Sequence, residues 1–151
     1  MGTVQLISFA DIFKAPNAKE LFAEYAAECS IPAVGPVNPQ IELYRRMEQS
    51  GLSKTFGVFH EEQLIGFATL LRSPLPHYGV WAGTVESLFV MKDHRKGGAG
   101  RELIRFVKQY AKDAGCRVIF FSAKTGSQLE KLLYLMREYE PTNTIFMGSL
   151  D

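Results

Sequence analysis

The residues best suited to bind a ligand form one short run in which cationic side chains surround glycines. The run is residues 95–101, which are Arg95, Lys96, Gly97, Gly98, Ala99, Gly100 and Arg101. Glycines let the backbone approach a ligand closely, and a helix that begins here presents free N–H groups and the positive end of its dipole. Cations at that end are unfavourable unless an anion lies between them. The run therefore predicts a binding site for a polyanion such as a pyrophosphate.

Spacing excludes two other phosphate-binding motifs. The sequence contains no G-x-x-x-x-G-K-[ST], and no G-x-G-x-x-G follows a strand. A glycine-rich turn with solvated basic side chains is the alternative to an anion site. The order of an apolar strand, a basic turn and an amphipathic helix favours the anion site.

The elements that must position this turn follow from the hydrophobic pattern. Residues 80–91 predict a long strand that leads into the turn, and residues 100–114 predict an amphipathic helix that ends before Gly115. Residues 117–123 predict a buried strand, parallel to the previous one because a helix of crossover length separates them. The other expected elements are strands at 3–9, 54–60, 64–71 and 144–150, and helices at 17–29, at 39–50 after Asn38, and from Ser127 to about Tyr139.

Composition sets the class of protein. A chain of 151 residues with 46% hydrophobic content has the size of one domain. Seventeen basic and sixteen acidic residues leave a formal charge of +1, which disfavours nucleic acids and anionic membranes as partners. The sequence shows no export segment and no apolar run of membrane-spanning length, so we expect a cytoplasmic protein.

The cysteines and histidines show no pattern of a metal site. Cys29 and Cys116 are distant in sequence, and we expect both to be reduced and buried. His60, His77 and His94 lack the spacing of metal ligands, either with one another or with the cysteines. We therefore expect no metal.

The glycine run resembles the acyl-CoA signature of the GCN5-related N-acetyltransferases (GNAT), R/Q-x-x-G-x-G/A after a strand that ends in Val. Arg95, Gly98 and Gly100 fill that signature, five residues after Val90. The order of elements resembles the family over nearly the whole chain. The resemblance implies one domain, residues 1–151, with an α/β (α+β) fold: a mixed central sheet of about six to seven strands, about four flanking helices, and a V-shaped splay between the fourth and fifth strands.

The same resemblance implies acetyl-CoA as the cofactor. Backbone N–H groups from Arg95 to Arg101 would hold its pyrophosphate, and main-chain groups of Leu88, Phe89 and Val90 would hold the pantetheine arm and the acyl carbonyl. Ser127 departs from the family, because many members have an asparagine there that contacts the pantetheine. Its shorter side chain can also serve as the helix N-cap, so that contact is lost or mediated by water.

Two residues are candidates for catalysis. Tyr134 falls about 150° from the centre of its helix's apolar stripe, and it resembles the family's tyrosine that protonates the departing thiolate. A surface or packing tyrosine is the alternative. Glu86 shares a strand face with Leu88 and Val90 under strict alternation, and it is expected to act as general base, through water, or to bind the amine. A simple exposed strand residue is the alternative.

The expected reaction is direct transfer of an acetyl group from acetyl-CoA to a primary amine in a ternary complex. The acceptor, a small-molecule or peptide amine, is expected between the two early helices, the loop at 32–37 and the loop that contains His77, Tyr78 and Trp81. Aromatic side chains and few charges there favour a small or partly apolar amine. A homodimer is compatible with the resemblance. The alternatives are a non-catalytic acyl-CoA-binding module that contacts a protein partner and, disfavoured by charge, a nucleic-acid-binding domain.

Overall fold

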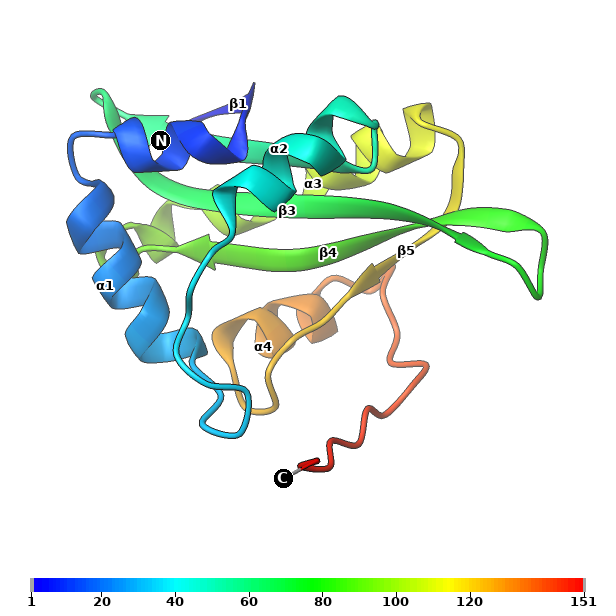
Figure 1. Ribbon diagram of the computed structural model, residues 1–151. Helices are drawn as coiled ribbons and strands as arrows, with labels where there is room; N and C mark the ends of the chain where they lie inside the picture. Colours follow the sequence, from blue (N-terminus) through cyan, green and yellow to red (C-terminus); the bar gives the residue numbers. More distant parts are fainter. Residues whose placement is uncertain (1, 151) are drawn as a thin grey trace.

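The structure, a computed structural model, describes residues 2–150 and contains one five-stranded sheet in which spatial order equals chain order (Figure 1). Neighbouring strands β1 to β4 are antiparallel, whereas β4 and β5 are parallel, as their crossover helix predicts. The strands are β1 Thr3–Ile7, β2 Ser53–His60, β3 Gln63–Leu75, β4 Val80–Val90 and β5 Cys116–Phe121. The mixed α/β class is confirmed.

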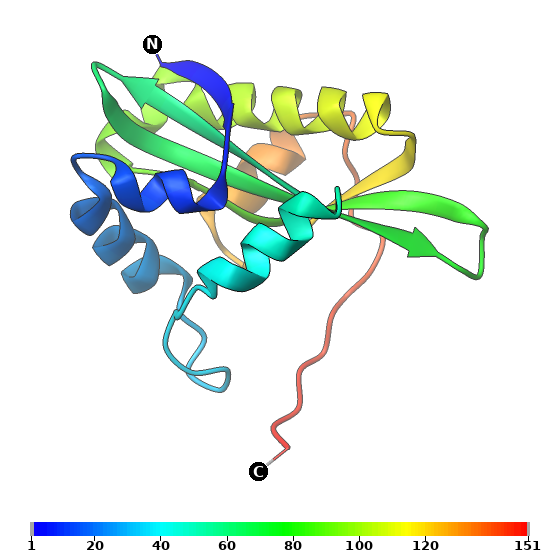
Figure 2. The same cartoon turned by 45° about the horizontal axis from the view of Figure 1, so that its top comes forward.

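Helices cover both faces of the sheet (Figure 2). Helices α1 and α2 lie on one face with the short helix η1, and the amphipathic α3 lies on the other. One core cluster, which includes Phe9, Phe67 and Phe89, is buried under α1 and η1. The second is buried under α3. The helices are η1 Phe9–Lys14, α1 Ala18–Cys29, α2 Ile41–Gln49, η2 Lys92–Gly97, α3 Ala99–Asp113 and α4 Gln128–Leu135.

Strands β4 and β5 separate part of the way along β4. Pairing with β5 runs from Trp81 to Val85, where Val85 faces Phe121. Residues 87–90 of β4 still pair with β3, but no described residue of β5 continues beside them. This is the expected splay between the fourth and fifth strands, and it leaves one backbone edge of β4 without a strand.

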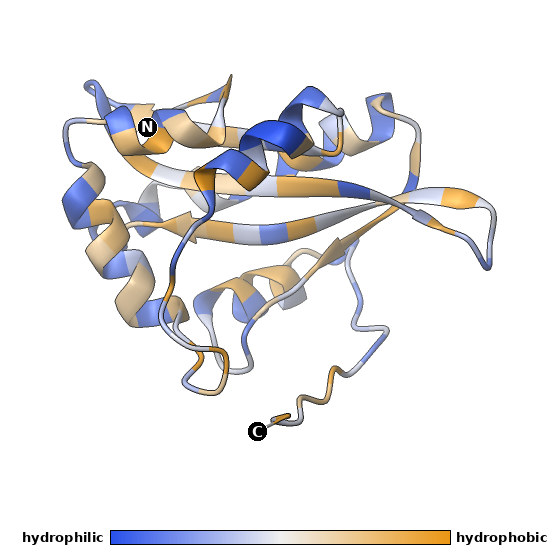
Figure 3. Ribbon diagram, in the orientation of Figure 1, coloured by the Kyte–Doolittle hydropathy of each residue, from blue (hydrophilic) through white to orange (hydrophobic). Residues whose placement is uncertain are grey.

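The predicted last strand, 144–150, is not formed, so the described sheet has five strands and not six to seven. Ile145, Phe146 and Leu150 are 81%, 90% and 101% exposed, and the segment extends away from the sheet. Figure 3 shows its apolar residues outside the body of the protein. An apolar segment gains strand stability only from a neighbouring strand or a core face, and here it has neither.

Helix α4 ends at Leu135, four residues before the predicted end at Tyr139. Met136 takes extended backbone angles and is buried. The chain then turns so that the ring of Tyr139 packs edge-on against Phe121 of β5, 5.1 Å between centroids. Contact with the sheet therefore replaces a further helical turn. At its start, Ser127 accepts a hydrogen bond from the Glu130 N–H at 3.2 Å, which confirms the predicted N-cap.

Helix α1 is tied to the sheet by a side-chain amide. Asn17, which precedes α1, is buried, and its Nδ2 donates to the Leu64 carbonyl at 2.9 Å. The Leu64 N–H donates to the Asn17 Oδ1 at 3.0 Å. Both backbone groups of Leu64, at the start of β3, are thus satisfied by one side chain. At the next helix the N-cap is Gln40, and the first residue is Ile41 in place of the predicted Pro39.

No helix among the described residues is both long and apolar enough to span a membrane.

Candidate active site

The glycine run forms the end of η2 and the start of α3. Gly98 is the N-cap of α3 and has a φ of +85°, a conformation that favours glycine. The first helical hydrogen bond joins the Glu102 N–H to the Gly98 carbonyl at 3.1 Å. The N–H groups of Ala99, Gly100 and Arg101 therefore have no partner within the helix. Such groups can bind an anion at the start of a helix, and the anion site stays a prediction.

A Cβ on Gly100 would lie 3.3 Å from the Leu132 Cδ2, so α4 packs directly against this turn.

Arg95 is paired within the protein, so only two of the three cations at this end, Lys96 and Arg101, support the argument for a bound anion. Its Nε donates to the Val90 carbonyl at 2.7 Å, and its guanidinium forms an ion pair with Glu28 of α1. Arg95 thereby fixes the end of β4 against α1. None of the ion pairs found among residues 2–150 involves Lys96 or Arg101, so these two cations carry the positive charge of the turn.

A cavity of about 600 Å³ lies in the splay between β4 and β5. Cationic side chains line the end near α3, and β4 lines the other end. Of the residues predicted to bind the cofactor, the cavity is lined by Leu88, Phe89, Val90, Arg95, Lys96, Gly98, Gly100, Arg101 and Ser127. Lys124 and Lys131 also line it. The donors and charges suit a phosphorylated ligand with an extended arm.

Two predicted cofactor residues do not line this cavity. Gly97 is exposed, and Ala99 is buried in the core under α3.

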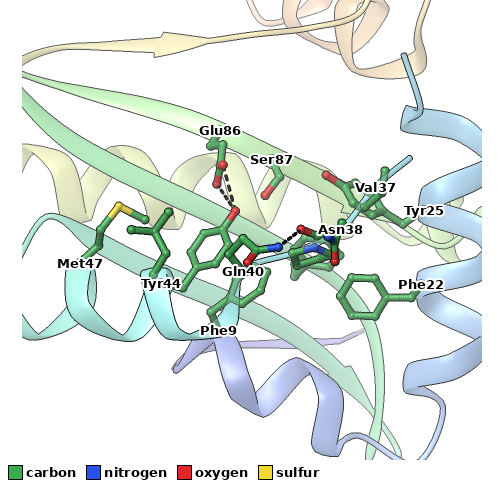
Figure 4. Close-up of a pocket in the computed structure, with 13 residues that line it drawn as sticks. Phe9, Phe22, Tyr25, Val37, Asn38, Gln40, Tyr44, Met47, Glu86 and Ser87 are labelled. Atoms are coloured by element: carbon green, nitrogen blue, oxygen red, sulfur yellow. Dashed lines mark hydrogen bonds between the residues drawn. The ribbon is translucent and has the colours of Figure 1, made fainter. Parts of the chain in front are cut away.

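A second cavity of about 310 Å³ lies between α1, α2 and the sheet (Figure 4). Most of its wall is apolar or aromatic. The thirteen lining residues are Phe9, Phe22, Tyr25, Val37, Asn38, Pro39, Gln40, Leu43, Tyr44, Met47, Phe67, Glu86 and Ser87. Tyr25, Glu86 and Ser87 line both cavities. The two cavities therefore meet where β4 leaves β5.

Glu86 reaches this meeting point because of a β-bulge. In the β3–β4 register Leu70 faces Val85 and Thr69 faces Ser87, so Glu86 is the extra residue of β4. The prediction that Glu86 shares a face with Leu88 and Val90 is wrong. Those two residues pack toward α3, whereas Glu86 contacts Tyr44 of α2 on the other face. The bulge shifts the alternation by one residue, and a single sequence does not reveal it.

The carboxylate of Glu86 is held by a tyrosine that the sequence analysis missed. The Tyr44 hydroxyl donates to Oε1 at 2.9 Å and to Oε2 at 2.7 Å, and its ring stacks on Phe9 with centroids 3.6 Å apart. Burial, followed by the bond to Glu86, raises the pKa of Tyr44 well above its usual range. Tyr44 therefore remains a hydrogen-bond donor at physiological pH. A signal was present in the apolar positions of α2, Leu43, Tyr44 and Met47.

Tyr25 is the second missed tyrosine, on the α1 wall between the cavities. Burial raises the pKa of Tyr25 to about 12, with smaller contributions from Cys29 and Glu86. Its ring packs edge-on against Phe67 and Phe89, at 5.2 and 5.4 Å. It presents a neutral hydroxyl and a rigid aromatic face.

Tyr134, the predicted acid, lies on α4 and is 63% exposed. Of its neighbours, Leu132 and Leu135 line the larger cavity, and among the residues found to line either cavity Tyr134 is not included. Its catalytic role stays a prediction.

The elements expected around the acceptor line the smaller cavity only in part. Helices α1 and α2 and the loop from Val37 to Gln40 line the smaller cavity. The loop with His77 and Tyr78 is the tip of the β3–β4 hairpin, and its residues are not among those found to line either cavity. Trp81 lies under the Arg72 guanidinium there, 4.7 Å from the ring centroid. This hairpin is separate from the smaller cavity.

Among the described residues no group of three or more His, Cys, Asp or Glu side chains could hold a metal ion. Cys29 and Cys116 are not disulfide-bonded, and both are half-buried, not fully buried as expected.

The structure fits the acyltransferase class that the sequence resemblance implies: β4 and β5 splay apart, the start of α3 borders the larger cavity, and Glu86 lies where the two cavities meet. A family model confirms this class: the Acetyltransferase (GNAT) family matches residues 18–133. The chain belongs to this family and is an enzyme of acyl transfer. Members generally use acetyl-CoA. A comparison with curated protein sequences gave no match.

Solved structures share the fold over the whole chain. The ribosomal-protein-alanine N-acetyltransferase from Brucella melitensis biovar Abortus 2308 is 20% identical, with 97% of each chain covered and a TM-score of 0.72. The glucosamine-6-phosphate N-acetyltransferase from Arabidopsis thaliana is 14% identical, with 100% of this chain and 99% of that chain covered and a TM-score of 0.71.

An aminoglycoside acetyltransferase from an uncultured soil metagenomic sample, in complex with sisomicin, is 16% identical, with 99% of this chain and 97% of that chain covered and a TM-score of 0.73. The names of these three proteins indicate different acceptors, so the shared fold does not select one.

Proposed function

We propose that this enzyme transfers an acetyl group from acetyl-CoA directly to a primary amine, with both substrates bound at once. The observation that carries the proposal is the pair of cavities that share Tyr25, Glu86 and Ser87. A donor in the larger cavity and an acceptor in the smaller one would approach each other at Glu86. Direct transfer then needs no covalent enzyme intermediate.

The larger cavity fits acetyl-CoA by its donors. Lys96, Arg101 and the free N–H groups at the start of α3 would hold the pyrophosphate. The unpaired edge of β4 at residues 88–90 would hold the pantetheine arm and polarise the acyl carbonyl. When bound, acetyl-CoA supplies the thioester that the amine attacks. Ser127 caps α4 and borders the cavity, so its hydroxyl has the helix N–H as a competing partner.

Glu86 is the proposed base. It would take a proton from the ammonium group of the acceptor, directly or through water, and so free the nitrogen lone pair. The N–C bond then forms, the C–S bond breaks, and its electron pair leaves on sulfur. Tyr134 is the proposed donor of the proton that this thiolate takes up. Tyr134 lies on α4 between Leu132 and Leu135, which both line the larger cavity, and this position supports the role.

Cofactor binding is tested by the melting temperature in acetyl-CoA. A ligand at a hundred times its dissociation constant adds about 2.7 kcal/mol of stability. Turnover is tested by release of free thiol with a panel of primary amines. Thiol release should require the amine and fall strongly in Glu86→Gln, while Tyr78→Phe on the distant hairpin should match the parent. A melting temperature that saturating acetyl-CoA leaves unchanged would overturn the proposal.

The acid is tested separately. Tyr134→Phe should slow thiol release and leave the affinity for acetyl-CoA unchanged. Unchanged turnover in this variant would remove Tyr134 from the mechanism and leave the thiolate to be protonated by water.

A further inference from the structure

The smaller cavity restricts the acceptor more narrowly than the fold does. We infer that the acceptor is a monoamine with an apolar, aromatic body, whose ammonium group binds beside Glu86 and whose body fills the aromatic part of the cavity. This inference rests on the proposed function, because it names the acceptor of the same site.

The size and wall of the cavity favour a compact aromatic body. A dry protein cavity of about 150 Å³ holds a benzene molecule, and this cavity has about 310 Å³. One ring and a short alkyl chain therefore fit. Five aromatic residues line the space, namely Phe9, Phe22, Tyr25, Tyr44 and Phe67. They hold one another in place through contacts such as the Phe9–Tyr44 stack, so the wall needs little ordering when a ligand binds.

The charge of the cavity excludes anionic acceptors. Glu86 is the only charged side chain among the thirteen that line it, and the other polar ones are Asn38, Gln40 and Ser87 with the two tyrosines. A carboxylate or phosphate on the acceptor would lose water without gaining a cation, which is costly. A second ammonium group would likewise find no second carboxylate. The cavity is therefore complementary to a single positive charge on an apolar molecule.

The amine end of the site is built by Glu86 and its hydrogen-bond donor. Tyr44 binds both carboxylate oxygens, and so fixes the plane of the group toward the cavity. The aromatic rings of Tyr25 and Tyr44 line the same space, where an ammonium group can gain cation–π attraction. Tyr44 acts on the acceptor through Glu86, which makes it a positioning residue.

A matched pair of amines tests the inference. 2-Phenylethylamine and phenylalanine have the same ring and the same amine, and differ by the carboxylate of phenylalanine. With acetyl-CoA, kcat/KM for 2-phenylethylamine should exceed that for phenylalanine by about 100-fold or more. Spermidine and glucosamine 6-phosphate, which carry extra positive and negative charges, should be as poor as phenylalanine. Calorimetry of the same amines with the free enzyme gives the ranking independently of turnover.

Two variants test the assigned residues. Tyr44→Phe keeps the ring that stacks on Phe9, and should raise KM for 2-phenylethylamine about tenfold while KM for acetyl-CoA stays the same. Leu43→Lys places a cation in the cavity at a position that is 54% exposed, so folding should survive. This variant should weaken the binding of 2-phenylethylamine and strengthen the binding of phenylalanine. Tyr78→Phe, outside both cavities, is the matched control for Tyr44→Phe.

The outcomes distinguish the inference about the acceptor from the proposed acetyl transfer. Acetyl-CoA that stabilises the enzyme, together with phenylalanine or spermidine that binds and reacts as well as 2-phenylethylamine, overturns the acceptor inference and leaves the acetyl transfer standing. No stabilisation by acetyl-CoA and no thiol release overturns the transfer itself. In that case selective binding of 2-phenylethylamine over phenylalanine would still support the monoamine site, and equal binding would refute it.

Discussion

Replacing Asn17 by alanine should cost the protein much of its stability, because one side chain satisfies two buried backbone groups. The amide accepts from the Leu64 N–H at 3.0 Å and donates to the Leu64 carbonyl at 2.9 Å, and Leu64 is fully buried. Each unsatisfied buried group costs about 1–3 kcal/mol. Allowing for partial relaxation, we expect a loss of roughly 3 kcal/mol. For a chain of this length the melting temperature would fall by about 6–12 °C.

Urea unfolding with two probes and calorimetry measure this loss. Asn143→Ala, at an exposed position, is the matched control and should be neutral. Asn17→Asp adds a test by pH: its carboxylate would face the Leu64 carbonyl, so the variant should be unstable at neutral pH. It should recover as the pH falls and the carboxyl becomes a donor. An Asn17→Ala protein within about 0.5 kcal/mol of the parent would refute the reasoning.

Three further results are expected. Gly98→Ala should lose about 1 kcal/mol in chemical unfolding because its φ of +85° disfavours any side chain, whereas Gly97→Ala, with no positive φ, should lose less. The hydrogen bond from the Ser8 N–H lowers the pKa of Asp11. The stability that this carboxylate contributes is therefore complete above its unfolded pKa and is lost as the pH falls through the lower folded value. Asp11→Asn should lack this acid-dependent part of the stability in unfolding measured from pH 6 to pH 2. Ser127→Ala should lose about 1 kcal/mol of stability, because the N-cap of α4 is removed, and it should bind acetyl-CoA more weakly in calorimetry. Ser127→Asp should keep its stability, which would show that the lost stability of Ser127→Ala comes from the missing cap.

The sequence predicted the parts of the fold that depend on local periodicity. Helix α3, the parallel pair β4–β5 and the N-cap at Ser127 were expected and are present. The end of α4 and the segment 144–150 were predicted wrongly, because both depend on tertiary contacts. Tyr139 leaves the helical path to pack on Phe121, and residues 144–150 lack a neighbouring strand.

The same contrast between local sequence pattern and tertiary contact applies to the two cavities of the candidate site. The cofactor residues were predicted mainly from a contiguous run with a known spacing, and most of them line the larger cavity, although their role stays a prediction. The smaller cavity joins Tyr25, Tyr44 and Glu86 from α1, α2 and β4, which only the folded chain brings together. Arg95 shows the limit even within the run, since its partner Glu28 lies on a helix far away in sequence.

The bulge at Glu86 shifts the alternation of side chains between the two faces of β4 by one residue. Before it, Val85 faces α3; after it, Leu88 and Val90 do, and Phe89 faces the opposite core. The extra residue keeps Val85 on the same face as Leu88 and Val90, which strict alternation would not allow. Substitutions there change one side chain, but the insertion or deletion of a single residue would exchange the two cores along the rest of the strand. We therefore expect this segment to tolerate changes of residue type far better than changes of length, which the yield of folded protein from a one-residue deletion series would measure.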